Sequence, residues 1–377
     1  MEEQKTLNTF SEKAKKVFSV ILKALKNPTF LYIVRRILSA LFTAILIVAV
    51  VTALIRLLPE TSLYDVKLYN RLPDAAADRY KASCLFQYGR CDKHGKPISI
   101  FENIVQYIYW MLPIYKEIPI KWDTKYDKVL EYFKGTVYFG RSIVQNKFVT
   151  DMLTERMGIS MKITLITVFF TYLIGYPFGI AMSKKPGGII DKIGNVFIVL
   201  NYAIPGLVFY LFMKNILGSP DGIFGFLNLG LFYEEGKPLT LVPPIFCMVF
   251  LSIPGVIIWL RRFMIDELSS DYVKFARSKG LSENRIMYTH VLRNAIVPLV
   301  RNIPATFIGA IVGSYFVEKI WSIPGTGILL ITALQNEPDV PVVQGLTVIY
   351  ALLGMVSFLL GDIITVFFDP RIKLRAE

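Results

Sequence analysis

Five stretches of this chain run for 19 to 23 residues without one charged side chain. They are residues 37–55, 163–182, 193–213, 238–260 and 340–361. A helix of about 20 mainly apolar residues crosses the hydrocarbon core of a bilayer, and a helix satisfies its own backbone hydrogen bonds there. The pattern therefore predicts a chain that crosses a membrane repeatedly, and it excludes a soluble globular domain.

A sixth apolar stretch, residues 302–317, is shorter than the others. Apolar residues continue just beyond Glu318 and Lys319, whose stems can snorkel toward the interface, so we count this stretch as a span. The composition agrees, because 54% of the residues are hydrophobic and 19% are charged. We predict an all-α, polytopic membrane protein with six transmembrane helices.

The formal charge of +13 is spread in a pattern that indicates membrane orientation and not nucleic-acid binding. Lysine and arginine number eight in residues 1–36, three in 184–192, eight in 261–301 and three after Asp369, against three in the alternate loops 214–237 and 318–339 together. Cytoplasmic loops carry the excess of basic residues. Both termini and the loop at 261–298 are therefore predicted to be cytoplasmic.

The charge and hydropathy pattern divides the chain into five parts. They are a basic amphipathic helix on the inner leaflet (1–29), the first span (30–58), an extracytoplasmic insert (59–157), a membrane core (158–368) and a cytoplasmic tail (369–377). The first span is not a cleavable signal, since a long basic segment precedes it. The insert is too aromatic for disorder, so we expect a folded cap, with residues 104–112 forming a helix at the membrane surface.

Two cysteines of the insert, Cys84 and Cys91, have six residues between them. A disulfide would pin the insert in an oxidising compartment, and two free thiols are the alternative; the spacing does not decide between them. The histidines, His94 and His290, fall on opposite sides of the predicted membrane and cannot share a metal ion. Residues 89–96 have the wrong spacing for a phosphate-binding loop.

Several predicted spans contain residues that break or closely pack helices. Glycine and proline interrupt the second, third and fourth spans at Gly175, Pro177, Gly179, Pro205, Gly206, Pro254 and Gly255. Each is either a break that lines a cavity or an ordinary packing kink. Gly309 and Gly313 form a small-xxx-small pair, which predicts close approach of another helix.

A charged island at residues 271–284 separates the fourth and fifth spans. Ser270 is placed to cap a short helix, Gly280 ends it, and Ser282 and Glu283 begin a second helix. We predict that Tyr272, Phe275 and Ala276 are exposed for a partner, and that the small Ala276 and Gly280 allow its backbone to come close. The alternative is a pair of interfacial helices that link two spans.

The island and its flanks match motifs of one family. Residues 271–282 (DYVKFARSKGLS) and 290–298 (HVLRNAIVP) resemble the cytoplasmic loop of permease subunits of oligopeptide and dipeptide ABC importers. Further similarities are PGTG at 324–327, VVQG at 342–345, DPR at 369–371, YIVRR at 32–36 and FGRS at 139–142. The chain departs from the family in its longer insert and in the run at 336–341.

The resemblance implies the type I ABC importer permease fold, in which the island is a coupling helix that docks on a cytoplasmic ATPase. The implied docking residues are Asp271, Tyr272, Phe275, Ala276, Arg277, Lys279, Gly280, Leu281, Ser282 and Glu283. The implied partners are a second homologous permease subunit, two cytoplasmic ATPase subunits that carry ATP and magnesium, and an extracytoplasmic peptide-binding lipoprotein. This chain would hold no cofactor and no catalytic residue.

In this family the chain would form half of a pathway for oligopeptides in a bacterial cell membrane; dipeptides, nickel and glutathione are the alternative cargoes. Three charges near span ends, Lys162, Lys214 and Asp362, either snorkel or pair between helices, or bind a peptide terminus. Two other classes were weighed: a membrane-embedded enzyme, which needs clustered polar groups at one depth, and a receptor whose island contacts a signalling protein.

Overall fold

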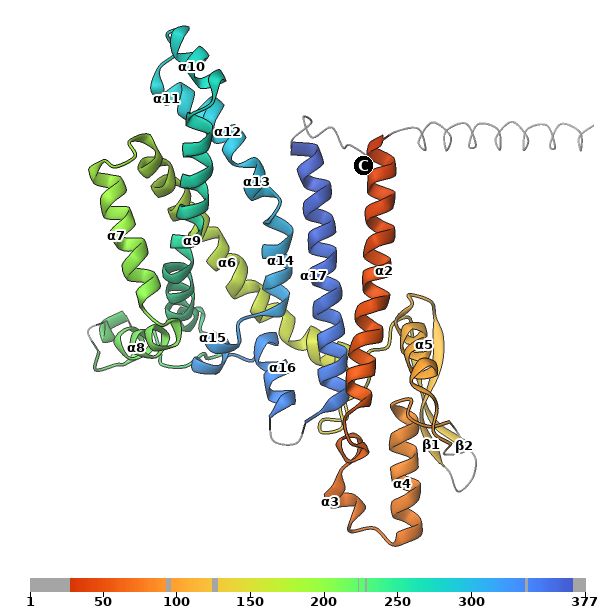
Figure 1. Ribbon diagram of the computed structural model, residues 1–377. Coiled ribbons are helices and arrows are strands. Elements are labelled where there is room, and N and C mark those ends of the chain that lie inside the picture. The colour runs from red at the N-terminus through yellow and green to blue at the C-terminus, as the bar shows by residue number, and fades with distance from the viewer. Residues whose placement is uncertain are drawn as a thin grey trace, which may run out of the picture.

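The computed structural model describes residues 28–92, 96–123, 128–222, 224–227, 229–335 and 338–368. Residues 1–27 of the predicted amphipathic helix, His94 and the tail 369–377 lie outside the described residues. The described chain is mostly helical, with its long helices side by side and a small subdomain at one end (Figure 1). We call that end the insert end, and the opposite end, which carries helix α10, the α10 end.

Among the described residues, five helical segments are long and apolar enough to cross a membrane. They are α2 (Pro28–Arg56), α6 (Val149–Lys184), η3 and α9 (Pro238–Leu241, Val242–Leu268), the run α13, α14 and α15 (Val297–Val300, Ile303–Val312, Tyr315–Ile320), and α17 (Val340–Phe368). The pair α7 (Ile189–Ala203) and α8 (Gly206–Gly218) passes the same test together but is bent by 95°. The described residues thus hold five candidate spans, or six if the bent pair is one broken span, which confirms the predicted polytopic helical fold.

The bend between α7 and α8 falls at Pro205, which cannot donate the backbone hydrogen bond that would continue the helix. Of the two alternatives for Pro205 and Gly206, the structure shows a break, which divides the predicted span at 193–213 into two helices. At the bend, Asn201 Nδ2 donates to the Phe250 carbonyl of α9 at 2.9 Å. At the far end of α7, Arg261 of α9 donates twice to the buried Asp191, at 2.6 and 2.8 Å. Helix α7 is thus fixed to α9 near both of its ends.

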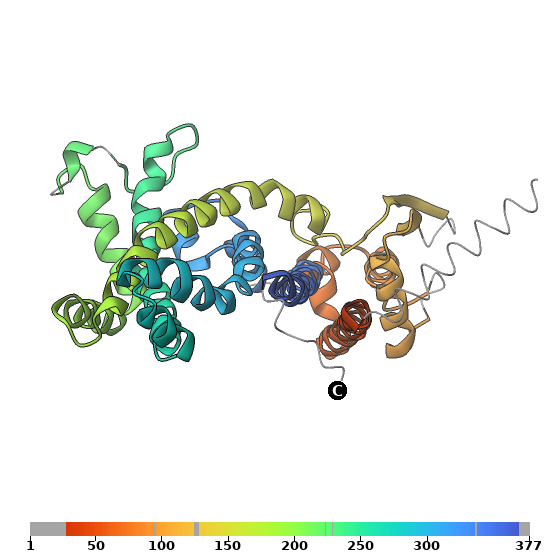
Figure 2. The same cartoon turned by 90° about the horizontal axis from the view of Figure 1, so that it is seen from above.

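Helix α6 runs along one side of the bundle, from the neighbourhood of α17 to α7 (Figure 2). Its Gly175 and Gly179 face α9, where an added Cβ would lie 3.0 Å from Val256 Cγ1 and 3.2 Å from Leu260 Cδ2. These glycines do not break the helix; they let two helices approach closely. The predicted pair makes no such contact within this chain, because Gly313 ends α14 with a φ of 78° and a Cβ on Gly309 would meet no atom within 4 Å; an interface with another subunit stays a prediction.

We expect Gly179→Leu to lower the unfolding temperature of the detergent-purified chain, because the added side chain pushes α6 away from α9. Overpacking of this kind costs about 1–3 kcal/mol. Gly309→Leu is the matched control, since that position has open space within the chain. Equal unfolding temperatures for the two variants would show that the α6–α9 contact is looser than the structure indicates.

The first and last spans pack together and are joined near the α10 end by a buried carboxylate. Asp362 of α17 pairs with Arg36 of α2 at 3.0 Å and with Arg301 at 2.7 Å. Farther along the helices, Gln344 Nε2 donates to Thr52 Oγ1 at 3.3 Å. Of the roles left open for Asp362, the structure shows pairing between helices.

The insert contains both helices and strands. Its elements are η1 (Glu60–Leu63), α3 (Val66–Tyr69), α4 (Asp74–Gln87), α5 (Ile100–Met111) and an antiparallel pair, β1 (Lys116–Asp123) and β2 (Lys128–Gly135). The all-α prediction therefore holds for the membrane part, and the insert adds a two-stranded sheet. The sequence hid this sheet because Pro119 and a register shift interrupt the alternation of apolar and polar residues in β1.

The insert is tied to the end of the first span by two arginines. Arg90 donates to the carbonyls of Ile55 at 2.7 Å and Arg56 at 3.0 Å, which are terminal acceptors of α2. Arg56 in turn donates to the Ile98 carbonyl at 2.6 Å. Arg56 is therefore part of the joint between α2 and the insert.

The two cysteines of the insert are free thiols in the structure. Burial raises the pKa of Cys84 and of Cys91 to about 11, so both thiols stay protonated near neutral pH. Helix α6 begins at Val149, inside the region predicted as the insert (59–157). Its first turns are helical since Val149 and Leu153 pack in a buried cluster with Leu346 of α17.

Candidate functional site

The predicted hairpin is present at the α10 end (Figure 1) as α10 (Asp271–Ser278), α11 (Glu283–Arg285) and a π-helical turn, η4 (Ile286–Val291). The chain leaves α10 at Gly280, whose φ of +74° favours glycine. Ser270 occupies the N-cap position, but its side chain makes no capping bond. The hydrogen bond from the Lys274 ammonium to Asp271, 2.8 Å long, lowers the pKa of that exposed carboxyl.

One face of α10 is locked into the protein. Val273 and Ala276 are buried in a cluster with Leu260 and Met264 of α9 and with Ile286, Met287 and Val291 of η4. Leu281 packs against the same cluster. The prediction that Ala276 is exposed for a partner is therefore wrong: its methyl group faces the end of α9. A displacement of α10 must move α9 with it, because close-packed side chains transmit strain.

The opposite face of α10 is free within the described chain. Phe275 is 61% exposed, and the Lys279 ammonium lies 4.4 Å from the centre of its ring. Arg277 donates twice to Glu283, at 2.7 and 3.1 Å, and this bidentate pair bridges the corner and lowers the pKa of Glu283. The aromatic ring, Lys279 and the open side of Gly280 together form a projecting surface, which we call the α10 knob.

The remaining predicted docking residues support this hairpin or lie beside the knob. Tyr272 is half-buried and its hydroxyl donates to Glu267 Oε2 at 2.6 Å. Ser282 is exposed at the N-cap position of α11, again without a side-chain capping bond. Asp271 and Glu283 are exposed acids at either side of the corner. The structure thus divides the predicted set into an exposed face and a structural face.

At the insert end, a buried carboxylate organises the loop with the PGTG motif. Glu318 is 2% exposed and accepts hydrogen bonds from Ser160 Oγ at 2.8 Å, Ser314 N at 3.2 Å and Ile328 N at 2.8 Å. The sequence predicted that Glu318 snorkels toward the interface; the structure instead buries its carboxylate. A Cβ at Gly313 or Gly325 would overlap its carboxyl group, so these glycines make room for Glu318.

A second buried carboxylate, Asp339, joins two motifs that are distant in sequence. It accepts hydrogen bonds from Ser142 Oγ at 2.5 Å and from Ile143 N at 3.1 Å. A Cβ at Gly345 would lie 2.7 Å from the Phe139 carbonyl oxygen. The FGRS and VVQG motifs therefore pack directly against each other beside the start of α6.

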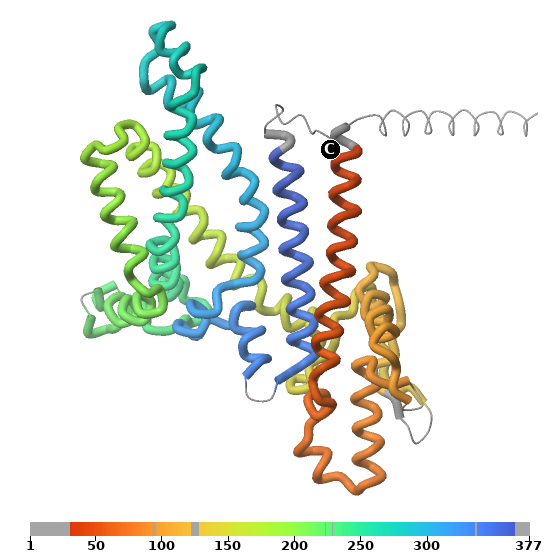
Figure 3. Tube along the Cα trace, in the orientation of Figure 1, coloured from red at the N-terminus to blue at the C-terminus, as the bar shows by residue number. Residues whose placement is uncertain are grey.

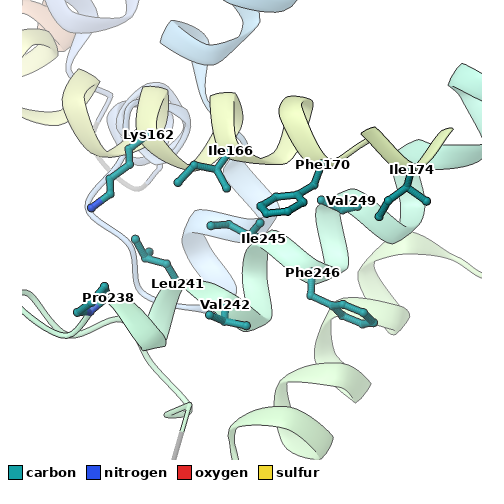
Figure 4. A pocket seen from close by; sticks show the side chains of 10 residues that line it. All are labelled: Lys162, Ile166, Phe170, Ile174, Pro238, Leu241, Val242, Ile245, Phe246 and Val249. Carbon is teal, nitrogen blue, oxygen red and sulfur yellow. The ribbon is translucent and has the colours of Figure 1, made fainter. Parts of the chain in front are cut away.

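Two of the three charges whose role the sequence left open have partners. Besides Asp362, Lys214 donates to the Ile320 carbonyl at 2.8 Å and lies 3.7 Å from the Phe232 ring centre. Lys162 makes no ion pair within the described residues. It lies at one end of a pocket of about 460 Å³ between α6 and α9, whose other lining side chains are apolar (Figure 4).

The described part of the chain contains no group of three or more His, Cys, Asp or Glu side chains that could hold a metal ion.

Comparison with known proteins gives the family. Residues 175–374 match the family described as binding-protein-dependent transport system inner membrane component. This match covers more than half of the chain and includes the α10 knob and Glu318. The chain belongs to this family. A permease of the family works with ATPase partners and a substrate-binding protein. The whole insert lies outside the matched residues.

Several relatives are transport permeases. The chain is 32% identical over 254 residues to the dipeptide transport system permease protein DppB of Lactococcus lactis, covering 67% of this chain and 81% of that protein. It is 31% identical over 266 residues to the oligopeptide transport system permease protein AppB of Bacillus subtilis, covering 67% of this chain and 81% of AppB. These names confirm that the family is a transport component and not an enzyme.

A third relative is longer than this chain. The oligopeptide transport system permease protein AmiC of Streptococcus pneumoniae is 37% identical over 226 residues, which are 59% of this chain and 44% of that protein. Among solved structures, one of an inward-facing MetNI methionine ABC transporter aligns with 58% of this chain and with 97% of the transporter chain, with a TM-score of 0.45 and 18% sequence identity.

Proposed function

We propose that this permease conducts oligopeptides and forms half of the translocation pathway of an ABC importer. The names of the relatives support a peptide cargo, since DppB, AppB and AmiC are named for dipeptide or oligopeptide transport. Dipeptides, nickel and glutathione are the alternative cargoes. The other half of the pathway is a second, homologous permease subunit, and a binding lipoprotein delivers the peptide at the insert end.

In this proposal the α10 end faces the cytoplasm of a bacterial cell. The start of α2 and the α10 hairpin lie toward this end (Figure 1). Arg36, near the start of α2, and Arg301 both pair with Asp362 near the end of α17, and an excess of basic residues marks the cytoplasmic side. The amino and carboxyl termini are then cytoplasmic, the insert is extracytoplasmic, and no nucleic acid takes part.

The α10 knob is the part of this chain that docks in a cleft of the ATPase. The observation that carries this proposal is the division of α10 into an exposed face, with Phe275 and Gly280, and a face locked to α9 through Val273 and Ala276. Two ATPase subunits bind ATP and magnesium, and each drives one permease subunit. This chain supplies neither nucleotide contact nor cofactor.

The coupling follows from the packing. A movement of α10 is passed to α9 through the buried cluster that holds Ala276, and from α9 to α6 where Gly175 and Gly179 let the helices touch. Both helices carry proline, at Pro177 and Pro254, without a break in the helix. ATP binding and hydrolysis would then shift the two permease halves between two packed arrangements, which is alternating access.

Uptake of labelled peptides tests the cargo. In cells lacking the gene, we expect the full chain to restore uptake of a labelled tetrapeptide or pentapeptide, and excess unlabelled oligopeptide to compete at least tenfold better than nickel or glutathione. The reason is that a pathway for oligopeptides must accept many side chains and so cannot select a metal ion. Restoration of nickel or glutathione uptake without peptide uptake would contradict the proposal.

A further inference from the structure

One part of the insert runs back along the first span. Residues 100–115, which we call the finger, comprise α5 and the tip at residues 112–115. The finger starts next to the end of α2, where Arg56 binds the Ile98 carbonyl at 2.6 Å. Farther along it, Tyr107 and Trp110 share a buried cluster with Val48 of α2 and Val348 of α17. Figures 1 and 3 show α5 beside the lower part of α2.

The depth of the finger in the membrane can be measured along the two helices that it contacts, α2 and α17. Arg36 and Asp362 are paired and so lie at one level at the α10 end. Arg56 is twenty residues after Arg36 on α2, about 30 Å at 1.5 Å per residue, which matches the thickness of the hydrocarbon core. Val48 lies about 12 Å back from Arg56 toward the α10 end.

The last span gives a second measure of the same depth. Val348 is fourteen residues before Asp362 on α17, about 21 Å from the level of the ion pair. About 9 Å of a 30 Å core remain beyond it. Both helices therefore place the partners of Trp110 about 10 Å inside the hydrocarbon, so the far half of the finger lies at the depth of acyl chains.

The outward surface of the finger is apolar. Phe101, Val105 and Tyr109 are exposed at a four-residue spacing, which puts them on one face of α5. The tip continues this surface with the sequence Leu-Pro-Ile-Tyr, in which Ile114 is 58% exposed. Turn residues are most often glycine, proline, asparagine, aspartate or serine; this turn has Pro113, and its other residues are apolar or aromatic.

Polar groups at both ends of the finger are hydrogen-bonded within the chain, as lipid favours. At its shallow end, Ser99 and Glu102 form a capping box with bonds of 3.2 and 2.8 Å. At its deep end, the buried Lys116 ammonium donates to the carbonyls of Tyr109 at 2.5 Å and Leu112 at 2.7 Å. Glu102 is the one charged residue of the finger, and it lies at the shallow end.

We propose that the finger is inserted into the lipid leaflet at the insert end, with the stripe of Phe101, Val105 and Tyr109 facing acyl chains. The insert is then a membrane-anchored subdomain whose helix α5 widens the bundle beside α2, and not a cap that only rests above the surface. The partner of this surface is phospholipid hydrocarbon, because depth, apolar exposure and internal hydrogen bonding all point to lipid.

Spin labels test the depth directly. Single cysteines are introduced as Phe101→Cys, Val105→Cys and Tyr109→Cys in a full-length chain whose three native cysteines are replaced and whose transport activity is retained. Ala75→Cys, at an exposed position near the start of α4, is the control. The labelled importer is reconstituted in nanodiscs of phosphatidylethanolamine and phosphatidylglycerol, and collisions with oxygen and with a water-soluble nickel chelate are measured.

Oxygen collisions are expected to exceed nickel collisions at all three finger positions, with the ratio rising from position 101 to position 109 as depth increases. The ratio is expected to be reversed at position 75. Frequent nickel collisions at position 109 would place the finger in water and overturn the proposal. Low collision rates with both reagents would also overturn it, because they would show that another protein covers the stripe.

Discussion

Replacing Phe275 by alanine is expected to remove the ATPase subunits from the purified permease and to reduce peptide-stimulated ATP hydrolysis at least tenfold. The ring is 61% exposed on the α10 knob and contributes little to the core of this chain. A buried aromatic anchor at the centre of an interface is worth about 2–4 kcal/mol, and each 1.4 kcal/mol is a factor of about ten in affinity. Copurification and ATPase activity in nanodiscs measure the effect.

The matched control is Phe226→Ala, which removes the same side chain from an 81% exposed position in η2 (Gly225–Leu227). We expect that variant to retain the ATPase subunits at the normal level. Both variants should give a normal yield of folded permease, since neither ring is buried. If Phe275→Ala binds the ATPase as well as Phe226→Ala does, the knob is not the docking surface.

Ala276 and Gly280 are poorer probes of docking than the sequence suggests. A larger residue at Ala276 would overfill the cluster against Leu260 and Met264 and would destabilise the hairpin itself. A side chain at Gly280 would have to adopt a φ of +74°. Loss of the ATPase in either variant would therefore not separate docking from folding, whereas Phe275→Ala does.

The sequence predicted the spans well because their signal is local. A run of uncharged residues specifies a membrane helix by length alone, and the corner at Gly280 is specified by its neighbours. The exposed side of α10 is a different problem. Phe275 and Ala276 are adjacent apolar residues on an eight-residue helix, and which of them faces the core depends on where the end of α9 lies.

The helix contacts and the buried carboxylates were harder to predict than the spans, because they too depend on residues that are distant in the sequence. Gly309 and Gly313 have the spacing of a close-packing pair, as do Gly175 and Gly179, and the choice between them depends on the neighbouring helix. Glu318 meets Ser160, 158 residues away, and no local pattern reports such a contact. Gly313 and Gly325 were the only sequence feature that could have indicated this site, and the reason for them is visible only once the position of the Glu318 carboxylate is known.

Glu318→Ala is expected to have the largest effect on folding of any single change at the insert end. The carboxylate accepts hydrogen bonds from Ser314 N and Ile328 N in a site that is almost closed to solvent. Its removal leaves those donors unpaired, at about 1–3 kcal/mol each, and adds a cavity in the core. We expect a loss of about 3–5 kcal/mol, seen as a strongly reduced yield of monodisperse chain in detergent and a lower unfolding temperature.

Two further variants separate hydrogen bonding from volume and charge. Glu318→Gln keeps the shape but turns one acceptor into an amide donor, which must face the donors that now bind Glu318; we expect an intermediate loss of stability. Lys319→Ala removes the exposed neighbouring charge and should leave the unfolding temperature unchanged. If Glu318→Ala unfolds at the same temperature as Lys319→Ala, the loop with the PGTG motif is held by its backbone alone. The expected ranking, with alanine worst and Lys319→Ala harmless, instead makes Glu318 the residue that holds this loop to α6 while the α10 end moves.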